Sequence, residues 1–275
     1  MMIAALVLLA SVPAAIPERD KSGLPHLRSE SVLVRFADTG EVLLAKNPDE
    51  VRPIASVTKL VSALVLAEIA PELLTATTAI TIDELDKDRL KYSKSRIAIG
   101  KSYPARDLLV AALSASDNRA ICALARSCGL ERIAFVDRMN QMATGLGMMR
   151  STFVDPAGLD PGNVSTARDL MALVAAAASN ALIRSAGLVT RVDLIDQRGS
   201  TLTLTCSNRL ARSDRWNVVV GKTGYTVEAG RAFVVRVDIE NRPVDMVFLG
   251  AREMQSVFGD AGRVRRWIVE KKLKS

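Results

Sequence analysis

The sequence predicts an α+β fold in which an antiparallel sheet is built from both ends of the chain, with a helical insertion between them. Three observations lead to this prediction. Runs of apolar residues typical of strands occur near both ends, at residues 32–45 and 218–249. Segments with helical spacing fill the middle, and one more closes the chain at residues 263–272. With 275 residues, 49% of them hydrophobic, the chain can bury one large core.

The amino-terminal part is predicted to be a β-hairpin followed by a helix. Strands are expected at residues 32–36 and 42–45, because Asp38-Thr39-Gly40-Glu41 between them is a typical turn. The next helix is expected to open at Ser56, since residues 60–67 are almost entirely apolar. Such a run indicates a helix that is buried on every side.

The helical insertion is expected to follow a short extended piece at residues 78–82. Pro104 suits the start of one helix, and Ser165 or Thr166 can cap another that runs through residue 178. Apolar residues recur at helical spacing between these two signals. Helices are predicted there at residues 107–115, 119–126 and 133–146.

The carboxyl-terminal part is predicted to return to strands after Gly187. Residues 218–220 lead directly into Lys222-Thr223-Gly224. Two later strands form a hairpin across Asn241-Arg242-Pro243. No repeat or low-complexity linker interrupts the chain, so residues 30–273 are expected to form one domain. The strands of the hairpin are predicted at residues 232–239 and 244–249.

Residues 1–15 are expected to be an export signal that is removed. The segment contains no charged side chain, and the small residues between Ser11 and Ala15 suit a cleavage site. It departs from the usual pattern because no Lys or Arg precedes the apolar run. This run is shorter than the roughly 20 residues that span a bilayer, so no membrane span is expected after cleavage. We therefore expect an exported, periplasmic protein.

Composition excludes several classes of function. The single histidine, His26, precedes the first strand, so neither a Ser-His-Asp triad nor a zinc site is expected, and no cofactor is implied. The net charge of +7 suits anionic surroundings, but basic and aromatic residues are not interleaved as in nucleic-acid-binding modules, so no nucleic acid partner is expected. Cys122 and Cys128 are six apart on a predicted helix, too far for a disulfide, and with Cys206 they are expected to be buried free thiols.

The pair Ser56 and Lys59 is the strongest chemical signal in the chain. Residues three apart on a helix share one face. A lysine in so apolar a segment is costly in its charged form, because desolvation disfavours the charge. A neutral lysine can take the proton of a serine and make that serine a nucleophile. The spacing alone is weak, since about one such pair is expected by chance in a chain of this length.

Two further motifs follow in order along the chain. Ser116-Asp117-Asn118 and then Lys222-Thr223-Gly224 come after Ser56-Val57-Thr58-Lys59. These elements in this order are the signature of penicillin-binding proteins and class A β-lactamases, so the chain resembles that superfamily of serine enzymes. Within it, the chain looks most like the D-alanyl-D-alanine carboxypeptidase/endopeptidase branch, the low-molecular-weight penicillin-binding proteins of the penicillin-binding protein 7 type.

The resemblance covers roughly residues 30 to 270 and implies both a fold and an activity. Members of the family have a five-stranded antiparallel sheet flanked by helices, the β-lactamase/transpeptidase-like fold. The implied activity is that of a serine-type DD-peptidase. Such an enzyme hydrolyses D-Ala-D-Ala or D-Ala–diamino acid bonds in peptidoglycan stem peptides, and β-lactams inhibit it. Further segments that match are Pro53-Ile54-Ala55 and residues 113–120, 146–148, 152–159 and 163–167.

The resemblance implies three catalytic residues. Ser56 would form the acyl-enzyme, and Lys59 would take its proton. Ser116 would relay a proton between Lys59 and the leaving amine. Burial and the nearby charge of Lys222 would both lower the pKa of Lys59 and keep it neutral.

The resemblance also implies five residues that bind substrate. Asn118 would hydrogen-bond the substrate backbone, while Lys222 and Thr223 would receive its terminal carboxylate. Gly224 would let the substrate approach the strand closely. The backbone N–H of Tyr225 and that of the nucleophile would form the oxyanion hole.

Two other functions stay open at this point. A class A β-lactamase needs a Glu-x-x-Leu-Asn loop, whereas residues 155–159 read Asp-Pro-Ala-Gly-Leu. A non-catalytic cell-wall or β-lactam-binding module is opposed by the three intact motifs. The sequence does not decide between carboxypeptidase and endopeptidase, nor whether Arg252 or Arg263 contacts the substrate carboxylate.

Overall fold

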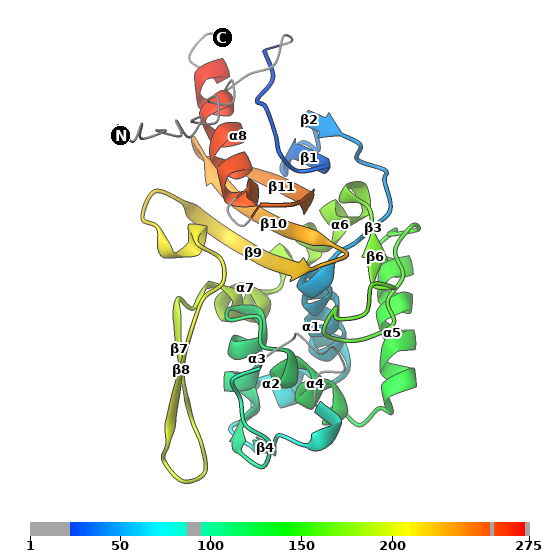
Figure 1. Ribbon diagram of the computed structural model, residues 1–275, viewed down its shortest axis with the longest axis vertical. Helices are drawn as coiled ribbons and strands as arrows, with labels where there is room; N and C mark the ends of the chain where they lie inside the picture. The colour runs from blue at the N-terminus through cyan, green and yellow to red at the C-terminus, as the bar shows by residue number, and fades with distance from the viewer. Residues whose placement is uncertain (1–22, 87–94, 254–255, 273–275) are drawn as a thin grey trace, which may run out of the picture.

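The computed structural model describes residues 23–86, 95–253 and 256–272, so the expected signal at residues 1–15 lies outside the described part. Its centre is a five-stranded antiparallel sheet with the strand order β2-β1-β11-β10-β9 (Figure 1). Strands from the two ends of the chain therefore lie side by side, as the sequence predicts. The strands are β1 (Ser31–Phe36), β2 (Val42–Lys46), β9 (Asn217–Thr226), β10 (Gly230–Ile239) and β11 (Arg242–Ala251).

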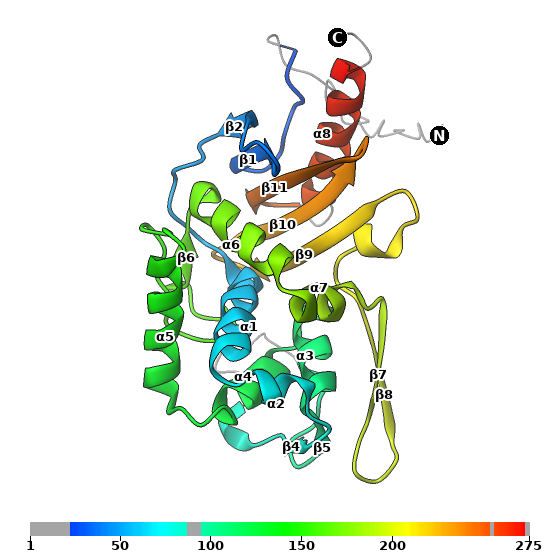
Figure 2. The ribbon, with the colours of Figure 1, turned by 180° about the vertical axis from the view of Figure 1, so that it is seen from behind.

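Each face of the sheet carries its own hydrophobic core. Along β10, Phe233 and Val235 point into one core and Ala232 and Val234 into the other, because successive side chains of a strand alternate between faces. The carboxyl-terminal helix α8 (Ser256–Lys272) covers the first face (Figure 1). Figure 2 shows the opposite face, where α6 (Ala167–Ser179) crosses the sheet.

The helical insertion extends away from this second face. Thr166, one of the two predicted caps, accepts a hydrogen bond from the backbone N–H of Asp169 and starts α6. A further helix that the sequence analysis missed begins at Asn180, whose side chain caps it in the same way. The other helices are α1 (Thr58–Ile69), α2 (Pro71–Thr75), α3 (Ala105–Leu113), α4 (Asn118–Arg126), α5 (Arg132–Gly145) and α7 (Ala181–Leu188).

Short elements connect these parts. Three two-stranded sheets pair β3 (Arg52–Pro53) with β6 (Val164–Ser165), β4 (Ala79–Thr81) with β5 (Ser102–Pro104), and β7 (Arg191–Ile195) with β8 (Thr201–Thr205). Three short 3₁₀ turns are η1 (Ala55–Val57), η2 (Glu84–Asp86) and η3 (Leu210–Arg212).

Three boundaries differ from the prediction in ways that concern the motifs. Ser56 lies in the 3₁₀ turn η1, which leads into α1, rather than in the first turn of the α-helix itself. Strand β9 includes Lys222-Thr223-Gly224 and runs to Thr226, beyond the predicted segment 218–220 that leads into this motif. Helix α8 begins at Ser256, ahead of the predicted start at residue 263.

Among the described residues no single helix is both long and apolar enough to cross a bilayer. Helices α6 and α7 reach that length and composition only as a pair, and they meet at an angle of 94°.

Candidate active site

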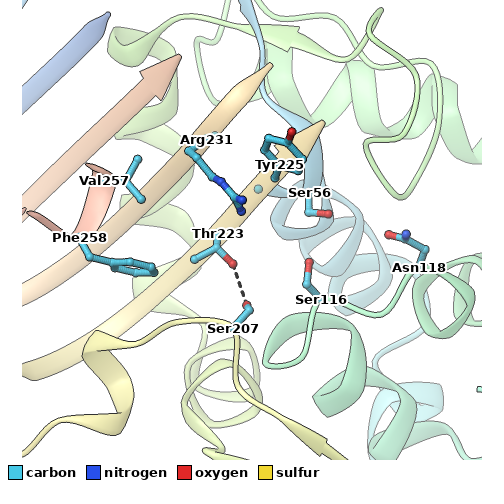
Figure 3. Close-up of a pocket in the computed structure, with 11 residues that line it drawn as sticks. Ser56, Ser116, Asn118, Ser207, Thr223, Tyr225, Arg231, Val257 and Phe258 are labelled. Atoms are coloured by element: carbon cyan, nitrogen blue, oxygen red, sulfur yellow. Dashed lines mark hydrogen bonds between the residues drawn. The ribbon is translucent and has the colours of Figure 1, made fainter. Parts of the chain in front are cut away.

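The three motifs come together beside the edge strand β9, where the helical insertion meets the sheet (Figure 3). Six of the predicted site residues line one open cleft there: Ser56, Ser116, Asn118, Thr223, Gly224 and Tyr225. The wall is completed by five residues that the sequence analysis did not select: Ser207, Arg231, Ala232, Val257 and Phe258. The other two predicted residues, Lys59 and Lys222, are buried behind this wall.

The side chain of Lys59 is fully buried and reaches the nucleophile. Its Nζ lies 2.8 Å from Ser56 Oγ, 2.6 Å from Asn118 Oδ1 and 2.8 Å from the backbone oxygen of Ala157. Two of these three partners are carbonyl oxygens, which can only accept a hydrogen bond. A neutral amine donates its two N–H bonds to such oxygens and turns its lone pair to the third partner. In its neutral form Lys59 would therefore turn its lone pair to the hydroxyl of Ser56.

A loop built around Asp155 holds the backbone oxygen of Ala157 in place. The buried Asp155 carboxylate accepts hydrogen bonds from the backbone N–H groups of Ala157 and Gly158, both at 2.7 Å, and of Asp160 at 2.8 Å. Gly158 has φ +79°, and a Cβ there would lie 1.9 Å from the backbone oxygen of Ala55, so the loop packs directly on the nucleophile turn. Sequence analysis missed this contribution because a backbone carbonyl has no side-chain signature.

Ser116 and Lys222 form the second part of the proton network. Lys222 Nζ donates to Ser116 Oγ at 2.7 Å and to the backbone oxygen of Thr223 at 2.9 Å. Ser116 has φ +63°, a left-handed conformation that is costly for a residue with a side chain and is often found at functional sites. Burial, reinforced by the charge of Lys59, holds the pKa of Lys222 well below its ordinary value.

Asp117, between the two site residues of its motif, has a structural role. Its carboxylate caps α4 by accepting a hydrogen bond from the backbone N–H of Ala120 at 3.1 Å. It also accepts the hydroxyl proton of Ser95, whose Oγ lies 2.7 and 2.9 Å from the two carboxylate oxygens. The cap fixes the start of the helix that carries Asn118, so that the amide of Asn118 meets Lys59.

A chain of hydroxyl groups continues along the cleft. Thr223 Oγ1 donates to Ser207 Oγ at 2.7 Å, and Ser207 Oγ donates to the backbone oxygen of Ser114 at 3.0 Å (Figure 3). Ser207 follows β8, outside the three motifs, so only the folded chain brings it to Thr223. Both hydroxyl protons are used within this chain, so Thr223 donates to an anion in the cleft only after its hydroxyl turns away from Ser207.

Gly224 lies where β9 touches the nucleophile turn. A Cβ at this position would lie 2.9 Å from the backbone oxygen of Ile54, 3.0 Å from the backbone nitrogen of Ser56 and 3.1 Å from Ala55 Cβ. The backbone that approaches Gly224 is therefore that of the Ser56 turn, whereas the sequence analysis assigned the glycine to substrate approach. This contact places the N–H groups of Ser56 and Tyr225, the expected oxyanion donors, on adjacent segments.

We expect Gly224→Ala to impair acylation without unfolding the protein. The added methyl group must push β9 and the Ser56 turn apart by a few tenths of an ångström, and such a shift separates the two oxyanion donors. Loss of one donor typically costs about 10²–10³ in rate. The rate of labelling by a fluorescent penicillin measures the effect. Gly145→Ala is the matched control, because a Cβ there meets nothing within 4 Å and the helix tolerates alanine. Equal rates for both variants would contradict this role of Gly224.

The cation that lines the cleft is Arg231. Its guanidinium carbon lies 4.0 Å from the centre of the Tyr225 ring, and register pairs these two residues across β9 and β10. Its Nε is buried and has no hydrogen-bond partner in the described part of the protein. Neither arginine considered from the sequence lines the wall. Arg252 is exposed, and Arg263 forms an ion pair with Asp260.

Other reactive groups are poor candidates for the chemistry. His26 is exposed and lies outside the cleft. All three cysteines are free, but only Cys206 is fully buried, while Cys122 and Cys128 are partly exposed, in contrast to the prediction. Burial raises the pKa of Cys122 to about 12, so it remains an unreactive thiol. Within residues 23–86, 95–253 and 256–272, no group of three or more His, Cys, Asp or Glu side chains could hold a metal ion.

Comparisons with known proteins agree on one family. Residues 18–253 match the family described as D-alanyl-D-alanine carboxypeptidase. A D-alanyl-D-alanine endopeptidase of Pseudomonas aeruginosa is 38% identical over 90% of this chain and 80% of its own length. One from Escherichia coli is 36% identical over 89% of this chain and 78% of its own.

Solved structures share the fold. The DD-transpeptidase of Streptomyces K15 superposes with a TM-score of 0.79, over 89% of this chain and 98% of that one, at 24% identity. A D-alanyl-D-alanine carboxypeptidase from Mycobacterium tuberculosis gives a TM-score of 0.77 over 94% of this chain and 95% of its own, also at 24% identity. At this level of identity the likeness shows the fold alone, a five-stranded α+β architecture.

Proposed function

The chain belongs to the D-alanyl-D-alanine carboxypeptidase family and is a serine-type DD-peptidase of peptidoglycan, and we propose that Ser56 is the residue that becomes acylated. One observation carries this assignment. Lys59 Nζ lies 2.8 Å from Ser56 Oγ and has two carbonyl oxygens to accept its N–H bonds, so a neutral Lys59 is oriented as a base.

Acylation follows from this arrangement. Ser56 Oγ attacks the carbonyl carbon of a D-alanine residue while its proton passes to Lys59 Nζ. The backbone N–H groups of Ser56 and Tyr225 hold the negative oxygen that forms. When the C–N bond breaks, Ser116 passes a proton to the departing amine, and Lys59 returns its proton to the network. Water then hydrolyses the ester on Ser56, and the released peptide ends in a carboxylate.

Recognition of the leaving residue uses the opposite side of the cleft. Thr223 offers a hydroxyl that can turn from Ser207 to a bound anion, and Arg231 offers a guanidinium whose Nε has no partner within the described residues. Lys222 lies behind them with a lowered pKa, and a bound carboxylate favours its protonation. A carboxylate on the leaving residue therefore fits this side of the cleft, while Asn118 can hold the acyl side of the peptide.

The preferred bond is the cross-link rather than the terminal D-Ala-D-Ala bond. The relatives from Pseudomonas aeruginosa and Escherichia coli are both D-alanyl-D-alanine endopeptidases, and they match this chain over most of their length. The substrate would then be a D-Ala–diamino acid bond between two stem peptides. Action there also fits export to the periplasm, which the segment at residues 1–15 suggests. β-Lactams would acylate Ser56 and block the site.

The β-lactamase alternative is disfavoured by the loop at residues 155–159. That activity needs a carboxylate free to activate water for deacylation. Asp155 is buried, and both of its oxygens accept hydrogen bonds from backbone N–H groups of its own loop. It is therefore engaged in holding Ala157 and is not free to act as a base.

Digestion of purified sacculi tests the proposed function. The protein without residues 1–15 is incubated with sacculi, and the soluble products are resolved by mass. Loss of dimeric muropeptides supports the endopeptidase, whereas conversion of pentapeptides to tetrapeptides alone supports the carboxypeptidase. Ser56→Ala serves as the inactive control. A protein that binds penicillin but changes no muropeptide would instead be a binding module.

A further inference from the structure

We propose that Phe258, together with Val257, forms a subsite for the aliphatic side chain of a cross-linked diamino acid leaving group. The proposal rests on the proposed function above, and it names the part of the cleft that separates a cross-link from a terminal D-alanine. None of the three motifs includes these residues. They come from the start of α8, at the far end of the chain.

The position of the two residues follows from the layout of the cleft. Ser56 stands at one end, next to Asn118 on the acyl side (Figure 3). Arg231 and Thr223 lie in the middle, where the carboxylate of the leaving residue would bind. Phe258 lies beyond them, on the side away from Ser56 (Figure 3). A side chain that continues past the carboxylate therefore meets Phe258.

The chemistry of this end of the cleft differs from that of the nucleophile end. The residues that α8 contributes to the lining at this end are Val257 and Phe258, and neither of them carries a polar group. Such a surface gains from burying methylene groups and cannot pair with an ammonium or a carboxylate. The D-centre of a diamino acid carries a chain of methylenes next to its carboxylate, whereas a terminal D-alanine carries one methyl group.

The apolar wall is held rigidly before any substrate arrives. The Phe258 ring stands edge-to-face against Phe233, with ring centres 5.1 Å apart and planes at 61°. Phe233 is fully buried in the core between the sheet and α8. In the same first turn of α8, the buried carboxylate of Asp260 accepts hydrogen bonds from the backbone N–H and hydroxyl of Ser29, at 2.8 and 2.6 Å. Phe258 itself remains partly exposed to the cleft.

The test compares two substrates and one inhibitor in Phe258→Ala. The substrates are a purified cross-linked muropeptide dimer, whose leaving group is the diamino acid, and a monomeric pentapeptide, whose leaving group is D-alanine. We expect kcat/KM for the dimer to fall roughly 15- to 60-fold, the size expected when contact with two or three methylene groups is lost. Cleavage of the pentapeptide and acylation by penicillin should stay within about twofold. Phe258→Leu, which keeps an apolar wall, should restore most of the dimer cleavage.

The controls distinguish the loss of a subsite from a general structural defect and from a failure of the proposed function. Val227→Ala changes an exposed apolar residue on the neighbouring β9–β10 turn, outside the cleft lining, and should alter neither substrate. An equal loss for dimer, pentapeptide and penicillin in Phe258→Ala would overturn the subsite, since Phe258 would then only support the site. Unchanged dimer cleavage would overturn it as well. A wild-type protein that binds penicillin but cleaves neither peptide would contradict the proposed function itself, and the subsite with it.

Discussion

Replacing Lys59 with methionine is expected to lower the rate of acylation of Ser56 by about 10²–10⁴-fold, the range that general-base catalysis contributes. Methionine keeps the length and the apolar character that suit the interior of α1, but it has no lone pair that can take the serine proton at neutral pH. The loss should be similar for penicillins and for peptide substrates, because both need the same proton removed from Ser56. Stopped-flow labelling with a fluorescent penicillin measures the rate.

Folding must be checked beside this rate, since Asn118 Oδ1 and the Ala157 oxygen lose a donor in the variant. A buried acceptor without a partner costs about 1–3 kcal/mol. Lys46→Met is the matched control, because Lys46 Nζ also donates to a backbone oxygen, that of Ser29 at 2.7 Å, but far from the cleft on β2. A folded Lys59→Met that keeps most of its acylation rate would show that another group is the base.

Replacing Lys222 with methionine is expected to weaken substrates with a free carboxylate far more than acyl donors that lack one. A desolvated carboxylate paired with a cation is typically worth a few kcal/mol, so kcat/KM should fall by about tenfold to a few thousandfold for the former. For a small thioester donor, kcat/KM should fall about tenfold or less, because such a donor is affected only through the altered contact with Ser116. Parallel assays of both donors measure the difference, and an equal loss would mean that Lys222 serves only the proton network.

The pH dependence of stability gives an independent check on Lys222. Its pKa is lowered in the folded protein, chiefly by burial, so the unfolded chain binds more protons between that lowered pKa and about 10.4. The free energy of unfolding of the wild type therefore gains a component that rises with pH across this window. Thermal melts of Lys222→Met should show a smaller rise over the same window. Parallel curves for both proteins would contradict the lowered pKa.

The fold could be predicted from the sequence because its signals are local. Alternating or continuous apolar runs predict strands at both ends, and turn and cap residues delimit the helices. The boundaries that failed depend on tertiary contacts instead. Strand β9 runs on to Thr226, beyond the predicted segment 218–220, because β10 pairs with it over that length. Helix α7 was missed because its signal is a single cap, Asn180, before only eight residues.

From the sequence, only those site residues could be predicted whose side chains belong to the three motifs in their fixed order along the chain. Ser56, Lys59, Ser116 and Lys222 are found from the motifs, and the structure joins them as two hydrogen-bonded pairs, Lys59 with Ser56 and Lys222 with Ser116. The Ala157 carbonyl, by contrast, has no signature of its own. Arg231 depends on the register of β10 against β9, and Phe258 on the docking of α8 across the sheet. Such contacts join segments far apart in the sequence, and one chain read alone does not reveal them.

Mass spectrometry of the penicillin adduct tests the central assignment most directly. The folded protein is incubated with a penicillin, digested, and the modified peptide is sequenced. The structure predicts one covalent adduct, an ester on Ser56, because Lys59 Nζ lies 2.8 Å from its hydroxyl and strand β9 packs against its turn at Gly224. An adduct on Ser116 or on any other residue, or no adduct in a folded sample, would contradict the assignment of Ser56 as the nucleophile.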